Sequence, residues 1–154
     1  SLYTSEIYDE WTYPLEQTRN QVTAVQIIEG RTIYFAVTSN FIKTLDSCRN
    51  CVVIMMGCNG LNKTDMAKAF IEKGANAYIS WDGSVSQEHT DNAADQLIRN
   101  LISKNQTIGE AINNTMNTVG SDPNYHSQLA YYPPEAENLT VTQNIKNNQC
   151  LYPL

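Results

Sequence analysis

The sequence has few basic residues, no basic run and no long apolar stretch. Lys and Arg number 10 against 16 Asp and Glu, which gives a formal net charge of −6 and a pI of about 4.8. Nucleic-acid partners are disfavoured, because phosphate recognition depends on clustered basic side chains. A membrane span is not expected, because no apolar run approaches the ~20 residues that a helix needs to cross a bilayer.

Histidine and cysteine are also scarce. The two histidines, His89 and His126, are the only imidazoles available for general acid–base chemistry. Four cysteines are too few to act as a disulfide scaffold in a chain of 154 residues. They are Cys48, Cys51, Cys58 and Cys150. A hydrophobic core is therefore expected, and a chain of this length can bury about two-thirds of its surface.

Short apolar runs predict the strands. Two β-rich runs, 22–28 and 32–37, are separated by Glu-Gly-Arg and predict a β-hairpin near residues 22–37. The runs 51–56 and 77–81 are each bounded by turn residues and predict two further strands. Unbroken apolar runs of this kind are typical of parallel strands that are covered on both faces.

Apolar residues at helical spacing, with capping residues at the ends, predict three main helices. The first begins at Thr64 or Asp65 and ends at Gly74, the second begins at Ser86, and the third begins with a capping box at 107–110 and ends at Gly120. The alternation of strands and helices predicts an α/β fold with a mostly parallel sheet and flanking helices. We expect one domain over residues 1–135 and an extended tail over 136–154.

The residues with the most chemistry follow the two predicted parallel strands. Gly57-Cys58-Asn59-Gly60 comes after the first strand and Trp81-Asp82-Gly83 after the second, and both should lie at the carboxyl edge of the sheet. Cys58 precedes a helix, whose N-terminus favours the nucleophilic thiolate, and the glycines beside it leave room for a substrate backbone. The alternative is that Cys58 is a small buried residue without a chemical role.

These residues resemble the nucleophile strand of caspase-like cysteine peptidases. The block 51–60, CVVIMMGCNG, has an apolar strand followed by a small residue, Cys, one residue and Gly. The segments 64–76 and 77–83, and the helices from Ser86 and from Gln106, resemble the elements after the nucleophile in the CHAT and gingipain-type branches. The resemblance covers about residues 33–120. It is closest to uncharacterised archaeal proteins of this type, which share MMGC, DMAKAFIEKGA, YISW and YYPPEA.

The resemblance implies a partial caspase-like fold and covalent acyl transfer from a peptide or protein substrate. Cys58 would attack the scissile carbonyl, and its backbone N–H, with the loop 57–60, would hold the oxyanion. Trp81 and Asp82 would line the substrate cleft, and the Asp82 carboxylate could attract a basic side chain. An ordinary Asp-Gly turn is the alternative for Asp82.

The departure from the family concerns the histidine. The partner His is expected about 50 residues before the Cys, and residues 1–57 contain none. We expect the strand that carries it to precede Ser1, so that this chain is the C-terminal portion of a longer peptidase and is inactive alone. His89, early in the helix after Trp81, is a possible surrogate base, with a solvated helix residue as its alternative. The second hypothesis is a caspase-like binding or scaffold module without a complete dyad.

A lesser alternative is nucleotide binding through Gly57–Thr64. This stretch reads GCNGLNKT against the phosphate-loop pattern G-x-x-x-x-G-K-[ST], with Asn62 in place of the second Gly. Asn tolerates left-handed backbone geometry better than most residues, so the change is not prohibitive. The acidic net charge of the chain disfavours nucleotide binding.

The cysteines do not suit one zinc site, because Cys51 and Cys58 lie at opposite ends of a strand and so about 20 Å apart. A disulfide between Cys48 and Cys51, or between either of them and Cys150, is open and would suit a secreted protein. Four N-x-[ST] sequons favour the same compartment, and they begin at Asn62, Asn105, Asn113 and Asn138. The sequence gives no reason to expect a metal or a cofactor, and it does not predict an oligomeric state.

Overall fold

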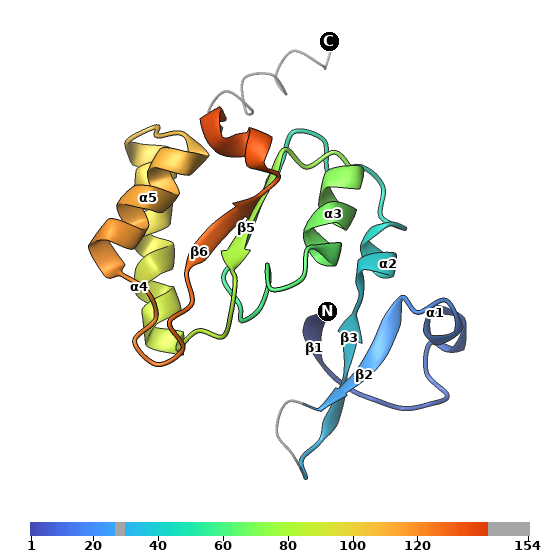
Figure 1. The fold of residues 1–154 in the computed structure, drawn as a ribbon. Coiled ribbons are helices and arrows are strands. Elements are labelled where there is room, and N and C mark those ends of the chain that lie inside the picture. The colour runs from blue at the N-terminus through green and yellow to red at the C-terminus, as the bar shows by residue number, and fades with distance from the viewer. Residues whose placement is uncertain (27–29, 142–154) are drawn as a thin grey trace. The chain divides into compact units, whose positions relative to one another are not determined.

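The structure is a computed structural model that describes residues 1–26 and 30–141 (Figure 1). The chain forms two compact units, Ser1–Ser47 and Cys48–Leu154, and each is described by itself. One domain over residues 1–135 was expected from the length of the chain, so no boundary was predicted at this point.

The first unit is an antiparallel sheet with two short helices. Its strands follow the spatial order β1-β3-β2, and they are β1 (Leu2–Ile7), β2 (Val22–Gln26) and β3 (Ile33–Val37). The hairpin prediction is confirmed, since β2 pairs antiparallel with β3 from Val22 opposite Val37 to Gln26 opposite Ile33. Residues 27 and 28 of the predicted first run lie outside the described residues.

The helices of the first unit begin where the sequence supplies a start signal. They are α1 (Pro14–Thr18) and α2 (Ser39–Ile42). A proline suits the first position of α1, because the N–H that it lacks would have no partner inside the helix. In α2 the hydroxyl oxygen of Thr38 caps the helix by accepting the Asn40 N–H at 3.1 Å.

The second unit is built on a mixed sheet of three strands in the order β4-β5-β6. They are β4 (Val52–Met55), β5 (Ala77–Trp81) and β6 (Leu129–Tyr132). β4 and β5 are parallel, with Val52 opposite Ala77, whereas β6 is antiparallel to β5, with Leu129 opposite Trp81. The mixed α/β character is confirmed.

The three predicted helices are confirmed to within a few residues of their ends. The second unit contains α3 (Asp65–Glu72), α4 (Gln87–Ile98), its π-helical continuation η1 (Arg99–Ser103), α5 (Ile108–Val119) and the short 3-10 helix η2 (Pro134–Asn138). The capping box of α5 forms in full. The Thr107 hydroxyl accepts the Glu110 N–H at 3.3 Å, and the Glu110 carboxylate accepts the Thr107 N–H at 3.0 Å.

The prediction of a mostly parallel sheet is wrong, because β6, a strand that was not predicted, joins the sheet antiparallel to β5. Two helices, α4 and α5, lie between β5 and β6. One crossover helix returns the chain to the opposite end of the sheet and produces a parallel strand. A second helix brings the chain back to the end at which β5 finished, so β6 must run the other way.

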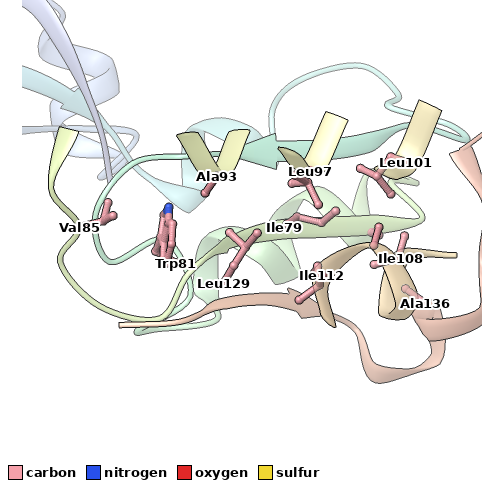
Figure 2. Packing of buried hydrophobic residues seen from close by; sticks show 12 residues of the cluster. Ile79, Trp81, Val85, Ala93, Leu97, Leu101, Ile108, Ile112, Leu129 and Ala136 are labelled. Atoms are coloured by element: carbon pink, nitrogen blue, oxygen red, sulfur yellow. The ribbon is translucent and has the colours of Figure 1, made fainter. Parts of the chain in front are cut away.

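β5 is the centre of the second unit, and all five of its residues are buried. Because side chains alternate along a strand, Ala77, Ile79 and Trp81 share one face of the sheet. They pack with buried residues of α4, α5 and β6, including Leu97, Ile112 and Leu129 (Figure 2). On the other face, the Tyr78 ring stacks on Phe70 of α3 at a centroid distance of 5.7 Å. Helices therefore cover both faces, as the unbroken apolar runs indicated.

Residues 136–141, expected at the start of an extended tail, belong to the folded unit. Ala136 in η2 is buried, the Leu139 carbonyl accepts the Ile108 N–H at 2.9 Å, and Thr140 forms a β-bridge with Thr107. The rest of the expected tail, 142–154, lies outside the described residues. None of the described helices has the length and apolar composition that crossing a bilayer requires.

Candidate active site

The two loops that were predicted to meet at the carboxyl edge of the sheet are in contact. The Asn59 N–H donates to the Gly83 carbonyl at 2.8 Å, and the Leu61 N–H donates to the Trp81 carbonyl at 2.9 Å. Parallel strands end at the same edge, so the segments after β4 and β5 are brought together by the topology alone. Two hydrogen bonds then fix the loop of Cys58 to the end of β5.

The shape of the loop explains its Asn-Gly sequence. Asn59 has a φ of 59°, in the left-handed region that Asn tolerates better than most residues. Gly60 is buried, and a Cβ added there would collide with Ser80 and with the end of the Met55 side chain. Glycine is therefore required at position 60 by the close approach of the loop to β5.

Cys58 has an exposed thiol at the end of β4, as the site hypothesis requires. Its sulfur lies 3.4 Å from both the backbone N and the carbonyl oxygen of Val85. A thiol is a weak donor and a weak acceptor, so both contacts are weak hydrogen bonds. The Val85 side chain is buried, and the sulfur therefore lies against an anchored stretch of backbone.

The Trp81 side chain belongs to the core and does not line an open cleft. It is fully buried, and its indole N–H donates to the Thr90 hydroxyl at 2.9 Å. That hydroxyl in turn donates to the Met56 carbonyl at 2.6 Å. The last strand position of β5 faces α4 and α5, so the sequence position at the edge of the sheet did not reveal the direction of the side chain.

Asp82 is exposed next to the loop of Cys58, and it also closes a turn. One carboxylate oxygen accepts the Gln128 N–H at 2.8 Å, and the Asp82 N–H donates to the Gln128 carbonyl at 3.0 Å. These bonds join the segment after β5 to the segment before β6. They match the turn alternative for Asp82.

The Nε2 atom of His89 has a carbonyl partner and is not available as a base. Its Nε2 lies 3.1 Å from the Gly120 carbonyl oxygen, and its ring lies against Trp81 at a centroid distance of 5.5 Å. A carbonyl oxygen can only accept, so in this contact Nε2 carries the proton and Nδ1 is the nitrogen that can accept one. His126 lies exposed in a turn with a φ of 57°. Neither of the two histidine rings, both of which the structure describes, is hydrogen-bonded to the Cys58 thiol.

Asp122 is a buried carboxylate that the sequence analysis missed. It accepts the backbone N–H groups of Ser86, Asn124 and Tyr125 at 2.8, 2.9 and 2.8 Å. Burial raises the pKa of this carboxyl, but the hydrogen bonds that stabilise the carboxylate outweigh it and lower the pKa to about 2. The sequence Asp-Pro-Asn indicates a turn at this position. It does not reveal the hydrogen bond to Ser86, which is 36 residues away.

Asp122 holds the loop that touches Cys58. It binds the Ser86 N–H, and the neighbouring Ser127 hydroxyl donates to the Ser84 carbonyl at 2.6 Å. Val85 lies between these two attachment points. The segment before β6 therefore positions the backbone against which the Cys58 sulfur lies.

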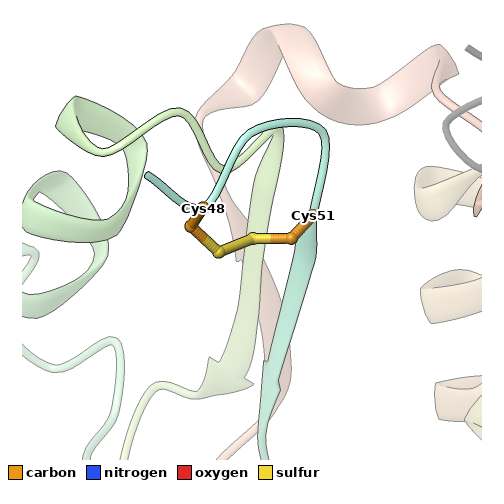
Figure 3. Close-up of a disulfide and its surroundings, with 2 residues drawn as sticks. All are labelled: Cys48 and Cys51. Carbon is orange, nitrogen blue, oxygen red and sulfur yellow. A yellow bond between two sulfur atoms is a disulfide. The ribbon is translucent and has the colours of Figure 1, made fainter. Parts of the chain in front are cut away.

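Cys48 and Cys51 are joined by a disulfide, with their Cα atoms 5.7 Å apart (Figure 3). This is one of the pairings that the sequence left open, and Cys150 lies outside the described residues. The Cys48 N–H donates to the Lys73 carbonyl at 2.8 Å, so the short loop is attached to the end of α3. The disulfide lies before β4 and the free thiol of Cys58 lies after it, at the other end of the strand.

The loop is poorly suited to hold a phosphate. A phosphate loop needs backbone N–H groups that converge on the ligand. Here the N–H groups of Asn59 and Leu61 donate to the carbonyls of Gly83, in the loop after β5, and of Trp81, the last residue of β5. These two N–H groups already have partners, and the nucleotide hypothesis for Gly57–Thr64 stays a prediction.

The four sequon asparagines all have exposed side chains in the structure. They lie in the loop after β4, before α5, within α5 and at the end of η2, and they are Asn62, Asn105, Asn113 and Asn138. Exposure permits glycosylation at each position, and the modification itself stays a prediction.

The fold and the site define a mixed α/β chain with an exposed thiol at the carboxyl edge of a parallel strand pair. Comparison with known proteins adds no relative to this description: no family model, no curated protein and no solved structure matches the chain.

Proposed function

We propose that Cys58 is the nucleophile of a caspase-like cysteine peptidase site, and that this chain alone does not hydrolyse peptides. The observation that carries the proposal is the position of Cys58. Its exposed thiol follows a strand that is parallel to its neighbour and precedes a helix, and the loop after the neighbouring strand touches it. This is the arrangement that the resemblance of the block 51–60 implies.

In the proposed reaction the Cys58 thiolate attacks the carbonyl carbon of a peptide bond. The C–S bond forms, the C–N bond breaks, and the amine leaves with a proton; water then cleaves the thioester and restores the thiol. The N–H groups of Asn59 and Leu61 donate to the end of β5. The Cys58 N–H is accordingly the oxyanion donor that we propose from this loop.

We expect this chain to be inactive alone because neither histidine is hydrogen-bonded to the Cys58 thiol. A cysteine peptidase needs a base that takes the thiol proton and an acid that protonates the leaving amine. His89 donates from Nε2 to the Gly120 carbonyl, and His126 lies in an exposed turn. Neither is hydrogen-bonded to Cys58, so proton transfer has no partner at the sulfur.

Active-site labelling tests the proposal. The oxidised chain is treated with a peptidyl acyloxymethyl ketone and with the same ketone lacking the peptide, and adducts are located by peptide mass spectrometry. We expect Cys58 to be labelled about tenfold faster by the peptidyl reagent, because about 1.4 kcal/mol of peptide binding gives that factor. Cys58→Ala should abolish the adduct, and Cys150→Ser is the matched control that should leave it unchanged.

Two outcomes would contradict the proposal. Equal labelling rates with and without the peptide would mean that no peptide site surrounds Cys58. Hydrolysis of a peptide substrate by the purified chain, lost in Cys58→Ala, would instead refute the inactivity of the chain and make His89→Gln the next variant to assay.

A second candidate function is a non-catalytic binding or scaffold module. The observation in its favour is that the Cys58 sulfur contacts both the N–H and the carbonyl of Val85, which is a structural use of the thiol. Equal labelling rates in the experiment above would favour this candidate.

A further inference from the structure

The first unit contains a pocket of about 310 Å³ to which both helices and all three strands contribute. Its walls are mainly aromatic and aliphatic, with Tyr13 before α1, Phe35 and a valine on β3, a valine on β2, and Phe41 in α2. Two carboxylates, Glu6 of β1 and Glu16 of α1, are the charged groups in its lining. A pocket of this size is at the lower end of the usual range for small-molecule sites and suits one large side chain.

The sheet register explains why these residues gather on one face. Val22 lies opposite Val37, and Phe35 precedes Val37 by two positions on the same strand, so these side chains share a face. The Phe35 ring is buried, and the Tyr13 ring meets it edge-on at a centroid distance of 5.3 Å. The Thr4 hydroxyl donates to the Phe35 carbonyl at 2.8 Å and fixes β1 beside this face.

The pocket carries negative charge without a matching cation. The Tyr13 hydroxyl lies 3.0 Å from both carboxylate oxygens of Glu6 and holds that side chain at the pocket wall. The hydrogen bond to Glu6, the charge of Glu6, burial and the charge of Glu16 together raise the pKa of the Tyr13 hydroxyl. No basic side chain lines the pocket, and within residues 1–26 and 30–141 Glu16 forms no ion pair.

We propose that this pocket binds an arginine side chain that is presented by a peptide. A guanidinium group stacks on aromatic rings, and its planar set of N–H donors can reach two carboxylates at once. Glu6 and Glu16 offer those carboxylates, and Tyr13 and Phe41 offer the rings. The inference concerns the unit Ser1–Ser47 and does not depend on the role proposed for Cys58.

Titration of the whole chain, labelled with nitrogen-15, tests the proposal by nuclear magnetic resonance. The probes are the acetylated amides of arginine, citrulline and lysine. Citrulline has nearly the shape of arginine but no charge. We expect saturable shifts of the amides around the pocket with the arginine probe, none with the citrulline probe, and weaker binding of the lysine probe.

Charge-removing variants locate the site. Glu16→Gln should weaken binding of the arginine probe about two- to fivefold, the range for a partly exposed ion pair. Glu88→Gln, an exposed carboxylate on α4, is the matched control and should bind as the wild type does. Added salt should weaken binding as well, because exposed charges are screened.

Several results would overturn the proposal. Absence of saturable shifts in the wild type, equal shifts with the citrulline probe, or tighter binding of the lysine probe would each do so without any variant. Unchanged affinity in Glu16→Gln, in a protein whose amide spectrum elsewhere matches the wild type, would remove the pocket carboxylates from the explanation.

Discussion

Gly60 provides a direct test of how the loop of Cys58 is held. A methyl group at this position would collide with the Ser80 side chain of β5 and with the end of the Met55 side chain. Met55 can rotate away, but Ser80 belongs to a strand that is buried on both faces. The loop must therefore move outward in Gly60→Ala, and overpacking of this kind costs about 1–3 kcal/mol.

The effect can be measured through the fluorescence of Trp81. This indole is fully buried in the second unit, whereas Trp11 in the first unit is 81% exposed, so the change on unfolding comes mainly from Trp81. For a unit of this size, a loss of 1–3 kcal/mol lowers the melting temperature by about 4–12 °C. Gly57→Ala is the matched control. Its added Cβ would have a single close neighbour, the Met55 sulfur at 3.1 Å, so the loss should be small.

Either of two results would show that the close approach of the loop to Ser80 does not determine its stability. One is a Gly60→Ala protein that melts at the wild-type temperature. The other is a Gly57→Ala protein that loses as much stability as Gly60→Ala, because the close approach to Ser80 would then not be the cause.

Two further predictions concern Asp122 and the disulfide. The folded-state pKa of Asp122, about 2, lies below the ordinary value of 3.8, so its contribution to stability is present above about pH 4 and is lost as the pH falls toward 2. Asp122→Asn should therefore flatten the acid part of a plot of urea midpoint against pH, which the exposed control Asp91→Asn should leave unchanged. Reduction of the bond between Cys48 and Cys51 should destabilise the second unit by about 2 kcal/mol, the chain-entropy value for so short a loop. A double Ser variant at these positions that melts like the oxidised wild type would contradict this.

The strands β4 and β5 and the helices α3, α4 and α5 could be predicted because their signals are local, whereas β6 and η2 were not predicted. The run 51–56 has only apolar residues and cysteine, and the capping box from Thr107 to Glu110 uses residues three apart. The topology of the last strand was not local. β6 runs antiparallel because two helices separate it from β5, and no strand was predicted over residues 129–132, although both helices were.

Only part of the candidate site could be predicted, because some of its contacts have local signals and others form only on folding. The meeting of the loops after β4 and β5 follows from strand direction, and Cys58 could be placed from the strand and the glycines around it. Asp122 could not be found, because its partner Ser86 lies in another loop and the contact exists only after folding. Trp81 was placed correctly along the chain, but its side chain faces the core.

Two weak hydrogen bonds link the Cys58 sulfur to the backbone of Val85, in the loop after β5. An alkylated or acylated sulfur has no S–H to donate, so the Val85 carbonyl loses a partner whenever Cys58 carries a group. The Val85 N–H, which donates to the same sulfur, would then exchange with solvent deuterium at a rate that reports the chemical state of Cys58. A single backbone amide thus serves as a built-in indicator of whether the thiol has reacted, and it does so without any added label.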